Sequence, residues 1–206
     1  MAQKLIAKGA EADVFTGSIA NIPAVFKKRK PKAYRVKALD EAIRSTRTKK
    51  EARLLHAAKS AGAKCPLVLS VGKNEIAMTR LNGKLMRELD ERKMIAVAPA
   101  IGTLLASLHS AGITHGDFTP ANIMVDGREV AVIDFGLGEF ARDDEELATD
   151  LLLMKKSVPA AAYAAFLKAY CKARGPGAQG KAAVATLARL EEIEKRGRYV
   201  VRGALA

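Results

Sequence analysis

Short apolar runs separated by turn residues dominate the first part of the chain. Runs of about four to eight residues bounded by Gly, Asn or Asp are typical of β-strands. They predict strands over residues 4–8, 12–17, 22–27, 67–71 and 75–79. Between the first two strands, the segment Gly9-Ala10-Glu11-Ala12 forms a tight connection that contains a single glycine.

Longer segments with apolar residues at helical spacing follow these runs. They predict helices over residues 36–61, 91–112, 159–174 and 181–195, and Asp150 opens a further buried run over residues 151–154. The pattern changes at Leu81-Asn82-Gly83. We therefore expect a lobe of short strands with one long helix over residues 1–82 and a mainly helical lobe over residues 83–206. Together they form one α+β domain.

The segment 114–136 combines a hairpin pattern with polar side chains at both ends. Two apolar runs flank an Asp-Gly turn, which is a strong hairpin signal. Pairing of the runs brings Asn122 close to Asp134, and Asp117 precedes Asn122 by five residues. Two carboxylates and an amide in this arrangement suit magnesium bound to a nucleotide, with a base beside the attacking group.

The spacing D-x-x-x-x-N followed by D-F-G is that of the catalytic and metal-binding loops of protein kinases. This spacing affects the interpretation of Glu51. Glu51 lies beside the apolar edge of the first helix, where a carboxylate needs a cationic partner. Pairing with Lys27 on the preceding strand would aim the Lys27 ammonium at nucleotide phosphates. The alternative is a surface pair with Arg47, which contributes about 0.3–0.5 kcal/mol. The catalytic-type loop downstream favours Lys27.

Several other polar positions carry two interpretations. The segment that joins the two lobes consists of Thr79, Arg80 and Leu81. Its backbone groups could bond an adenine edge, or it is a plain linker, and the pattern alone does not separate the two. We expect His109 to pack at a helix end and His115 to brace the loop, because no nucleophile or second histidine is placed to act with His115. Asp150 is either a partner of a helix dipole or a brace for the catalytic-loop backbone.

The net charge of +13 is concentrated between Lys27 and Lys50. Only Asp40 and Glu41 oppose the Lys and Arg residues of this stretch. A patch of this kind attracts a polyanion and steers its approach, but a solvated basic face has the same composition.

Composition also bears on the compartment. The chain has 206 residues, of which 49% are apolar, so it should fold into a core of its own. The chain has only two cysteines, Cys65 and Cys171. We therefore expect no disulfide framework, and a reducing compartment is favoured. We find no signal-peptide pattern and no apolar run that approaches a membrane span. The expectation is a cytoplasmic protein that does not contact a membrane.

A set of motifs along nearly the whole chain resembles one family. It comprises G-A-E-A, V-F-K-K-R-K-P-K-A-Y-R, R-T-K-K-E-A-R-L-L, H-G-D-F-T-P-A-N and D-F-G-L-G. The chain is similar to the PRPK family, the small atypical serine/threonine kinases and ATPases of the archaeal and eukaryotic KEOPS complex. The resemblance implies a minimal two-lobed protein-kinase-like fold without an activation segment. It also implies ATP and Mg²⁺ as ligands, and ATP hydrolysis that supports threonylcarbamoyladenosine formation on tRNA, together with serine/threonine autophosphorylation. The implied partners are a threonylcarbamoyl-transferase subunit, small regulatory subunits and, through the complex, tRNA.

The resemblance also assigns roles to residues. Lys27 and Glu51 match the phosphate-orienting pair, Asp117 the catalytic aspartate, and Asn122 and Asp134 the magnesium ligands. The connection from Gly9 to Ala12 matches the phosphate-covering loop, and Asp150 matches the aspartate that braces the catalytic loop.

The chain departs from the family pattern in its tail. The family's basic ending is replaced after R-G-R by Tyr199, Val200, Val201 and Arg202. Pro120 also stands where many members carry a hydroxyl residue. Two other functions stay open. The first is a small-molecule phosphotransferase of the aminoglycoside or choline kinase type, although little chain remains after Asp134 for the substrate-binding helices of such an enzyme. The second is a non-catalytic scaffold, which the single glycine of the phosphate loop favours.

Overall fold

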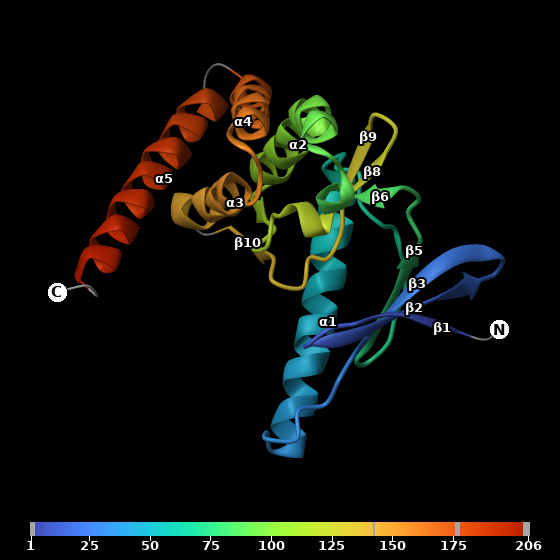
Figure 1. Cartoon of the computed structure of the whole chain (residues 1–206). Helices are drawn as coiled ribbons and strands as arrows, with labels where there is room; N and C mark the ends of the chain where they lie inside the picture. Colours follow the sequence, from blue (N-terminus) through green and yellow to red (C-terminus); the bar gives the residue numbers. More distant parts are fainter. Residues whose placement is uncertain (1–2, 142, 176–177, 204–206) are drawn as a thin grey trace.

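Five antiparallel strands form the sheet of the N-terminal lobe (Figure 1), in a computed structural model that describes residues 3–141, 143–175 and 178–203. The strands are β1 (Lys4–Lys8), β2 (Ala12–Ile19), β3 (Ile22–Arg29), β4 (Val68–Val71) and β5 (Glu75–Thr79), in the order β1-β2-β3-β5-β4. All five predicted strands are confirmed. Both β2 and β3 are two residues longer at their C-terminal ends than expected, and Ala20 and Asn21 turn the chain between them with φ angles of 47° and 65°.

Helix α1 (Lys37–Ser60) confirms the predicted long helix and lies against this sheet. Its buried side carries Leu54, Leu55 and Ala58, which join the main core, and also the carboxylate of Glu51. The chain leaves the helix at Gly62, whose φ of 83° suits a residue without a side chain.

Helices make up most of the C-terminal lobe. They are α2 (Glu91–Ser110), α3 (Asp144–Ser157), α4 (Ala160–Arg174) and α5 (Ala178–Gly203), with short 3₁₀ turns η1 (Met86–Glu88) and η2 (Pro120–Asn122). A small sheet joins β6 (Lys84–Leu85), β8 (Ile123–Asp126) and β9 (Glu129–Val132), and β7 (Ile113–Thr114) pairs with β10 (Glu139–Phe140).

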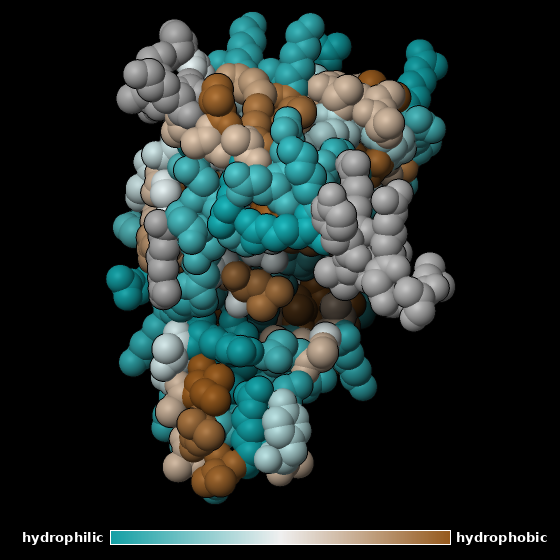
Figure 2. Space-filling view, turned by 90° about the vertical axis from the view of Figure 1, so that its left-hand side faces the viewer, coloured by the Kyte–Doolittle hydropathy of each residue, from teal (hydrophilic) through white to brown (hydrophobic). Residues whose placement is uncertain are grey.

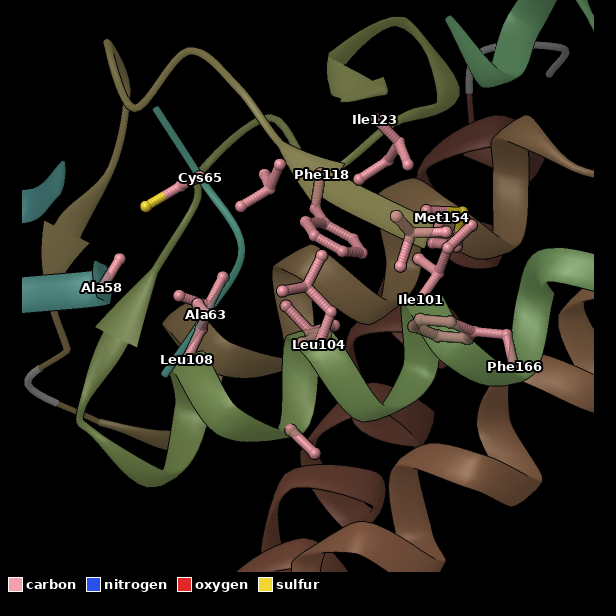
Figure 3. Close-up of a cluster of buried hydrophobic side chains, with 14 of the residues drawn as sticks. Ala58, Ala63, Cys65, Ile101, Leu104, Leu108, Phe118, Ile123, Met154 and Phe166 are labelled. Carbon is pink, nitrogen blue, oxygen red and sulfur yellow. The ribbon is translucent and has the colours of Figure 1, made fainter. Parts of the chain in front are cut away.

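The core of this lobe fixes the segment that carries the polar site residues. Phe118, which follows Asp117, is fully buried and points toward Leu104 of α2 (Figure 3). Phe166 of α4 and Ile123 at the start of β8 belong to the same cluster. Apolar burial of this kind contributes about 25 cal/mol per Å², so the residues between Phe118 and Ile123 are held at both ends by packing.

One helix corrects an expectation from the sequence. Among the described residues, α2 alone is long and apolar enough to cross a membrane by length and composition. The expectation that no run approaches a span is therefore wrong on these two criteria. In the structure, half of that apolar window is buried, with Ile101, Leu105 and Leu108 fully enclosed, and α2 packs mainly on α4. The apolar face of α2 is accounted for by the core that it builds.

Two further elements differ from the sequence-based expectation. Helix α3 begins at Asp144, so Asp150 lies inside the helix rather than at its start, and its interpretation as a helix-dipole partner is wrong. Helix α5 is longer at both ends than predicted. Residues 176–177 of the expected loop lie outside the described residues, as do the side chains of Tyr199 to Arg202, to which the structure assigns only helical backbone.

Candidate active site

The predicted hairpin brings the three polar residues of segment 114–136 together. Strands β8 and β9 pair through the turn at Gly127, and the Ile133 amide donates a hydrogen bond of 2.9 Å to the Asn122 carbonyl. The Asn122 side-chain NH₂ donates to both the backbone carbonyl of Asp117, at 2.9 Å, and its Oδ2, at 2.8 Å. With its NH₂ group held in this way, Asn122 keeps its amide oxygen available for a cation.

Asp134 follows β9 in a left-handed conformation, with φ at 65°. Its Oδ1 accepts hydrogen bonds from the Gly136 amide at 3.0 Å and from the Lys27 ammonium at 2.6 Å. Burial raises the pKa of Asp134, but the charge and hydrogen bond of Lys27 and the Gly136 amide outweigh it and hold the pKa below its usual value. Asp134 is therefore ionised near neutral pH, with Oδ2 free of these contacts.

Lys27 and Glu51 form the predicted pair. The Lys27 Nζ lies 2.7 Å from Oε1 of Glu51, and the Glu51 side chain is almost fully buried. Arg29, which the sequence did not single out, donates from Nη2 to Oε2 of the same carboxylate at 2.6 Å. Both oxygens of Glu51 are therefore bound by cations, and the surface pair with Arg47 does not form, because Arg47 pairs with Glu11 at 2.7 Å instead.

Two neighbouring cavities lie between the lobes. One has a volume of about 380 Å³ and is lined by charged and backbone groups, namely Lys27, Arg29, Arg47, Asp117, Asp134 and the connection from Gly9 to Ala12. The other has about 290 Å³ and a mostly apolar lining, which includes Val25, Met78, Met124 and Ile133. Both are lined by Val14, Lys27 and Asp134. A charged chamber beside an apolar one fits a ligand with a phosphate chain and a flat base.

The connection from Gly9 to Ala12 closes over the charged cavity as a tight turn. The Gly9 amide donates to the Ala12 carbonyl at 2.9 Å, and a Cβ at Gly9 would lie 2.8 Å from that oxygen. Lys32 donates to the Ala10 carbonyl at 2.6 Å, and Arg47 holds Glu11. The loop is thus fixed by side chains from outside rather than by further glycines.

The segment from Thr79 to Leu81 only partly meets the expectation of free backbone groups. The Thr79 amide donates to the Leu67 carbonyl at 2.8 Å, and the Arg80 amide donates to the Pro23 carbonyl at 2.9 Å. Both donors are used within the protein. Among the described residues, the Leu81 amide has no acceptor, and Leu81 lines the apolar cavity. Of the three predicted residues, Leu81 is the one whose amide remains for an adenine edge.

Asp150 holds the catalytic-type loop by its backbone. Its Oδ2 accepts from the His115 amide at 2.7 Å and its Oδ1 from the Gly116 amide at 2.9 Å. The His115 ring bonds the Ile133 carbonyl at 2.9 Å and so ties the loop to the segment before Asp134. The buried His109 adds a second layer, with its Nε2 at 3.3 Å from Asp150 and its Nδ1 at 2.9 Å from the Tyr170 hydroxyl. The sequence predicted His109 as a packed residue and missed this contact with Asp150.

Gly116 occupies its position for a reason that only the structure reveals. Its φ is 76°, and a Cβ at this residue would lie 2.3 Å from the Leu137 carbonyl oxygen. The segment after Asp134 therefore passes directly over the loop that carries Asp117. Beyond it, β10 pairs with β7 and Glu139 forms an ion pair with Lys50 of α1. Three residues separate Gly136 from the end of that strand at Phe140, so no extended activation segment intervenes between them.

The donor set fits magnesium with a nucleotide. Among the described residues, no group of three or more His, Cys, Asp or Glu side chains is placed to hold a metal. Asp134 and Asn122 supply one carboxylate and one amide oxygen, which is the sparse protein share that Mg²⁺ takes when phosphates and waters complete its octahedral shell. A structural or catalytic zinc would need three or four protein ligands and does not fit this set.

Comparisons with known proteins show which family the chain is similar to. Residues 24–154 match the RIO domain family. The chain is 38% identical over 198 residues to a probable bifunctional tRNA threonylcarbamoyladenosine biosynthesis protein of Methanothermobacter thermautotrophicus, covering 95% of the chain but only 36% of that relative. It is 35% identical over 200 residues to a probable serine/threonine-protein kinase BUD32 homolog of Archaeoglobus fulgidus, covering 94% of the chain and 95% of that protein.

The solved structures agree on the fold. A Rio2 kinase from Chaetomium thermophilum, in a complex with ADP, Mg²⁺ and phosphoaspartate, superposes with a TM-score of 0.65 at 16% identity, covering 94% of the chain and 70% of the kinase. At this identity the likeness concerns the fold alone, which is that of a protein kinase.

Proposed function

Because this chain belongs to the RIO domain family, and within it to the PRPK group of small atypical kinases, we propose that it hydrolyses ATP with magnesium and transfers its terminal phosphate to serine or threonine hydroxyls. One observation carries the proposal. Lys27, Asp117 and Asp134, which lie far apart in the sequence, line one charged cavity, and an apolar cavity shares Lys27 and Asp134 with it. This is the set of parts that phosphoryl transfer requires.

Each of the charged residues of the cavity has a separate proposed role. Lys27, which is paired with Glu51 and Asp134, would contact the phosphates when a nucleotide is bound. Asp134 and Asn122 hold magnesium, which offsets negative charge on the phosphates when it is bound. Asp117, fixed by the Asn122 amide and located in the charged cavity, orients the attacking water or hydroxyl and accepts its proton.

The biological setting follows from the relatives. The chain spans 36% of the length of the relative from M. thermautotrophicus, whose name assigns it to tRNA threonylcarbamoyladenosine biosynthesis. We place the ATP hydrolysis of this chain in support of that modification, within a KEOPS-type complex that contains a threonylcarbamoyl-transferase subunit and small regulatory subunits. The short connection after Gly136 supports control by a partner subunit, because it offers no long segment for phosphorylation to reorganise.

The basic stretch of β3 and α1 supports an approach to tRNA through that complex. Lys28 and Lys30 lie on exposed surface, with their ammonium groups 3.0 Å from Glu75 and 3.1 Å from Asp13. Exposed pairs of this kind contribute about 0–1 kcal/mol, so a polyanion can replace the carboxylate partners. Figure 2, which views the molecule from the left-hand side of Figure 1, shows hydrophilic surface interrupted by hydrophobic patches near the top, in the middle and at the lower end.

A three-way measurement of ATP hydrolysis tests the proposal. The rate is measured for the chain alone, with the threonylcarbamoyl-transferase partner, and with partner and tRNA together, each with magnesium and with a chelator. We expect magnesium-dependent hydrolysis that rises when partner and tRNA are added. Efficient phosphorylation of a free aminoglycoside or choline would instead identify a small-molecule phosphotransferase. Absence of nucleotide binding under all conditions would identify a scaffold.

A further inference from the structure

Arg29 lies at the edge of the charged cavity, beneath the loop expected to cover the phosphates. On β3 it follows Lys27 by two residues, so both side chains leave the same face of the strand. Strand pairing sets Arg29 opposite Ala12, the last residue of the covering loop. Although its side chain is only 4% exposed, Arg29 lines the 380 Å³ cavity.

The hydrogen bonds of Arg29 leave most of its donors unused. Nη2 donates to Glu51 Oε2 at 2.6 Å, and among the described residues the other N–H groups of the guanidinium have no protein acceptor. A guanidinium carries five N–H donors in a planar fork. None of these unpaired N–H groups is among the fully enclosed unpaired polar atoms of the described residues, so they keep access to open space, and the charged cavity that Arg29 lines is that space.

Lys27 and Arg29 both lie close to Gly136, at one wall of the charged cavity. A Cβ on Gly136 would lie 3.2 Å from Lys27 Nζ and 3.9 Å from Arg29 Nη2. Both groups therefore border the floor of the cavity directly after Asp134. An anion that enters over Gly136 meets both of them.

Charge balance shows when Arg29 becomes available. Lys27 and Arg29 face the carboxylates of Glu51 and Asp134, so the cluster of four is neutral. Once Asp134 holds magnesium, two cations remain for the single carboxylate of Glu51. The cluster then presents a net positive charge to the cavity.

We propose that Arg29 is a second phosphate-binding residue, whose free N–H groups bind the outer phosphates of a nucleoside di- or triphosphate while Nη2 keeps Glu51 in place. The proposal rests on the nucleotide-binding function proposed above and adds a ligand contact to it. A guanidinium matches phosphate oxygens in a two-pronged geometry that an ammonium does not offer. The contact also supplies donors that a covering loop with a single glycine provides poorly.

Arg29 could instead act only through Glu51, and a double-mutant cycle separates the two roles. The magnesium-dependent affinities for ATP, ADP and adenosine are measured by calorimetry for the natural chain, Arg29→Gln, Glu51→Gln and the double variant. If Arg29 contacts phosphate, Arg29→Gln weakens ATP binding about tenfold or more in both backgrounds, and adenosine binding stays unchanged. If the loss disappears in the Glu51→Gln background, Arg29 acts through Glu51 alone and the proposal is overturned.

Controls keep the result interpretable. Arg92→Gln removes an equal charge from the exposed start of α2 and should leave all three affinities unchanged. Circular dichroism and thermal unfolding establish that each variant folds. If Arg29→Gln does not fold, Arg29→Lys is used instead, because it keeps a cation beside Glu51 but loses the planar guanidinium. Weaker ATP binding with unchanged adenosine binding then supports the proposal. Undiminished ATP binding overturns it. Absence of ATP binding by the natural chain would overturn the proposed function itself.

Discussion

The ammonium of Lys27 lies 2.6 Å from Oδ1 of Asp134, a residue 107 positions further along the chain. The same ammonium lies 2.7 Å from Glu51 on α1. Lys27 therefore links the sheet and α1 of the N-terminal lobe to the segment that follows β9. The contact keeps two groups of opposite charge together at the place where magnesium and phosphate are proposed to separate them.

Asp134→Ala is expected to abolish magnesium-dependent ATP turnover and to leave the fold intact. The variant removes a proposed magnesium ligand, whereas Lys27 keeps Glu51 as its partner. Hydrolysis is measured across a magnesium titration, and circular dichroism checks the fold. Asp126→Ala, in the exposed turn of the same hairpin, is the matched control and should retain activity. An Asp134→Ala protein that still hydrolyses ATP would remove Asp134 from the metal site.

Gly116→Ala is expected to destabilise the chain more than Gly127→Ala. Both glycines have positive φ, which costs an alanine roughly 1–2 kcal/mol. At Gly127 a Cβ meets nothing within 4 Å, whereas at Gly116 it meets the Leu137 carbonyl oxygen at 2.3 Å. The clash adds roughly 1–3 kcal/mol. Urea unfolding of the two variants checks the difference, and equal losses would show that the loop adjusts without cost.

The elements that the sequence predicted are those with local signals. The Asp126-Gly127 signal predicted the hairpin that joins Asn122 to Asp134. In the structure Asp126 pairs with Glu129, so Gly127 and Arg128 form the two-residue turn, and turns of this length set the register of the strands around them. The partner of Glu51 was predictable because a carboxylate on a buried helix edge requires a cation. The start of α3 also had a local signal, because the Asp143 side chain accepts hydrogen bonds from the amides of Glu145 and Glu146. Asp143 is the first of four consecutive acidic residues, and composition alone did not distinguish it as the N-cap.

What the sequence did not predict depends on contacts between distant segments. The need for glycine at position 116 arises from Leu137, and the use of the Arg80 amide arises from Pro23. Neither contact leaves a trace in local pattern. Arg29 was overlooked for a different reason: in a stretch rich in Lys and Arg, composition does not tell which cation turns inward. Only its 4% exposure and its bond to Glu51 distinguish it.

His109 is expected to make stability depend on pH. Burial lowers the pKa of His109, and the Asp150 carboxylate opposes this only in part. The unfolded chain binds a proton at His109 near pH 6.5, whereas the folded chain remains neutral to lower pH. The free energy of unfolding therefore has its full His109 contribution above about pH 6.5 and loses it as the pH falls toward the folded pKa.

Unfolding in urea between pH 8 and pH 5 measures this dependence. The natural chain should lose stability over the acidic part of the range, and His109→Gln should show a smaller slope. His56→Gln, on the exposed side of α1, is the control that should keep the slope of the natural chain. A slope that does not change in His109→Gln would show that other groups set the pH dependence.

Neutralising the lysines at the end of β3 and in the segment that follows it is expected to weaken tRNA binding and its dependence on salt. The variant carries Lys28→Gln, Lys30→Gln and Lys32→Gln. Each phosphate contact that is lost reduces the slope of log affinity against log salt by about 0.9 or less. Binding to tRNA is measured from low to physiological salt for the chain in its complex. A control with Lys64→Gln, Lys93→Gln and Lys156→Gln removes the same charge elsewhere and should keep the natural slope. Affinity that does not fall with salt, or that the substitutions at Lys28, Lys30 and Lys32 leave unchanged, would show that this surface does not bind tRNA.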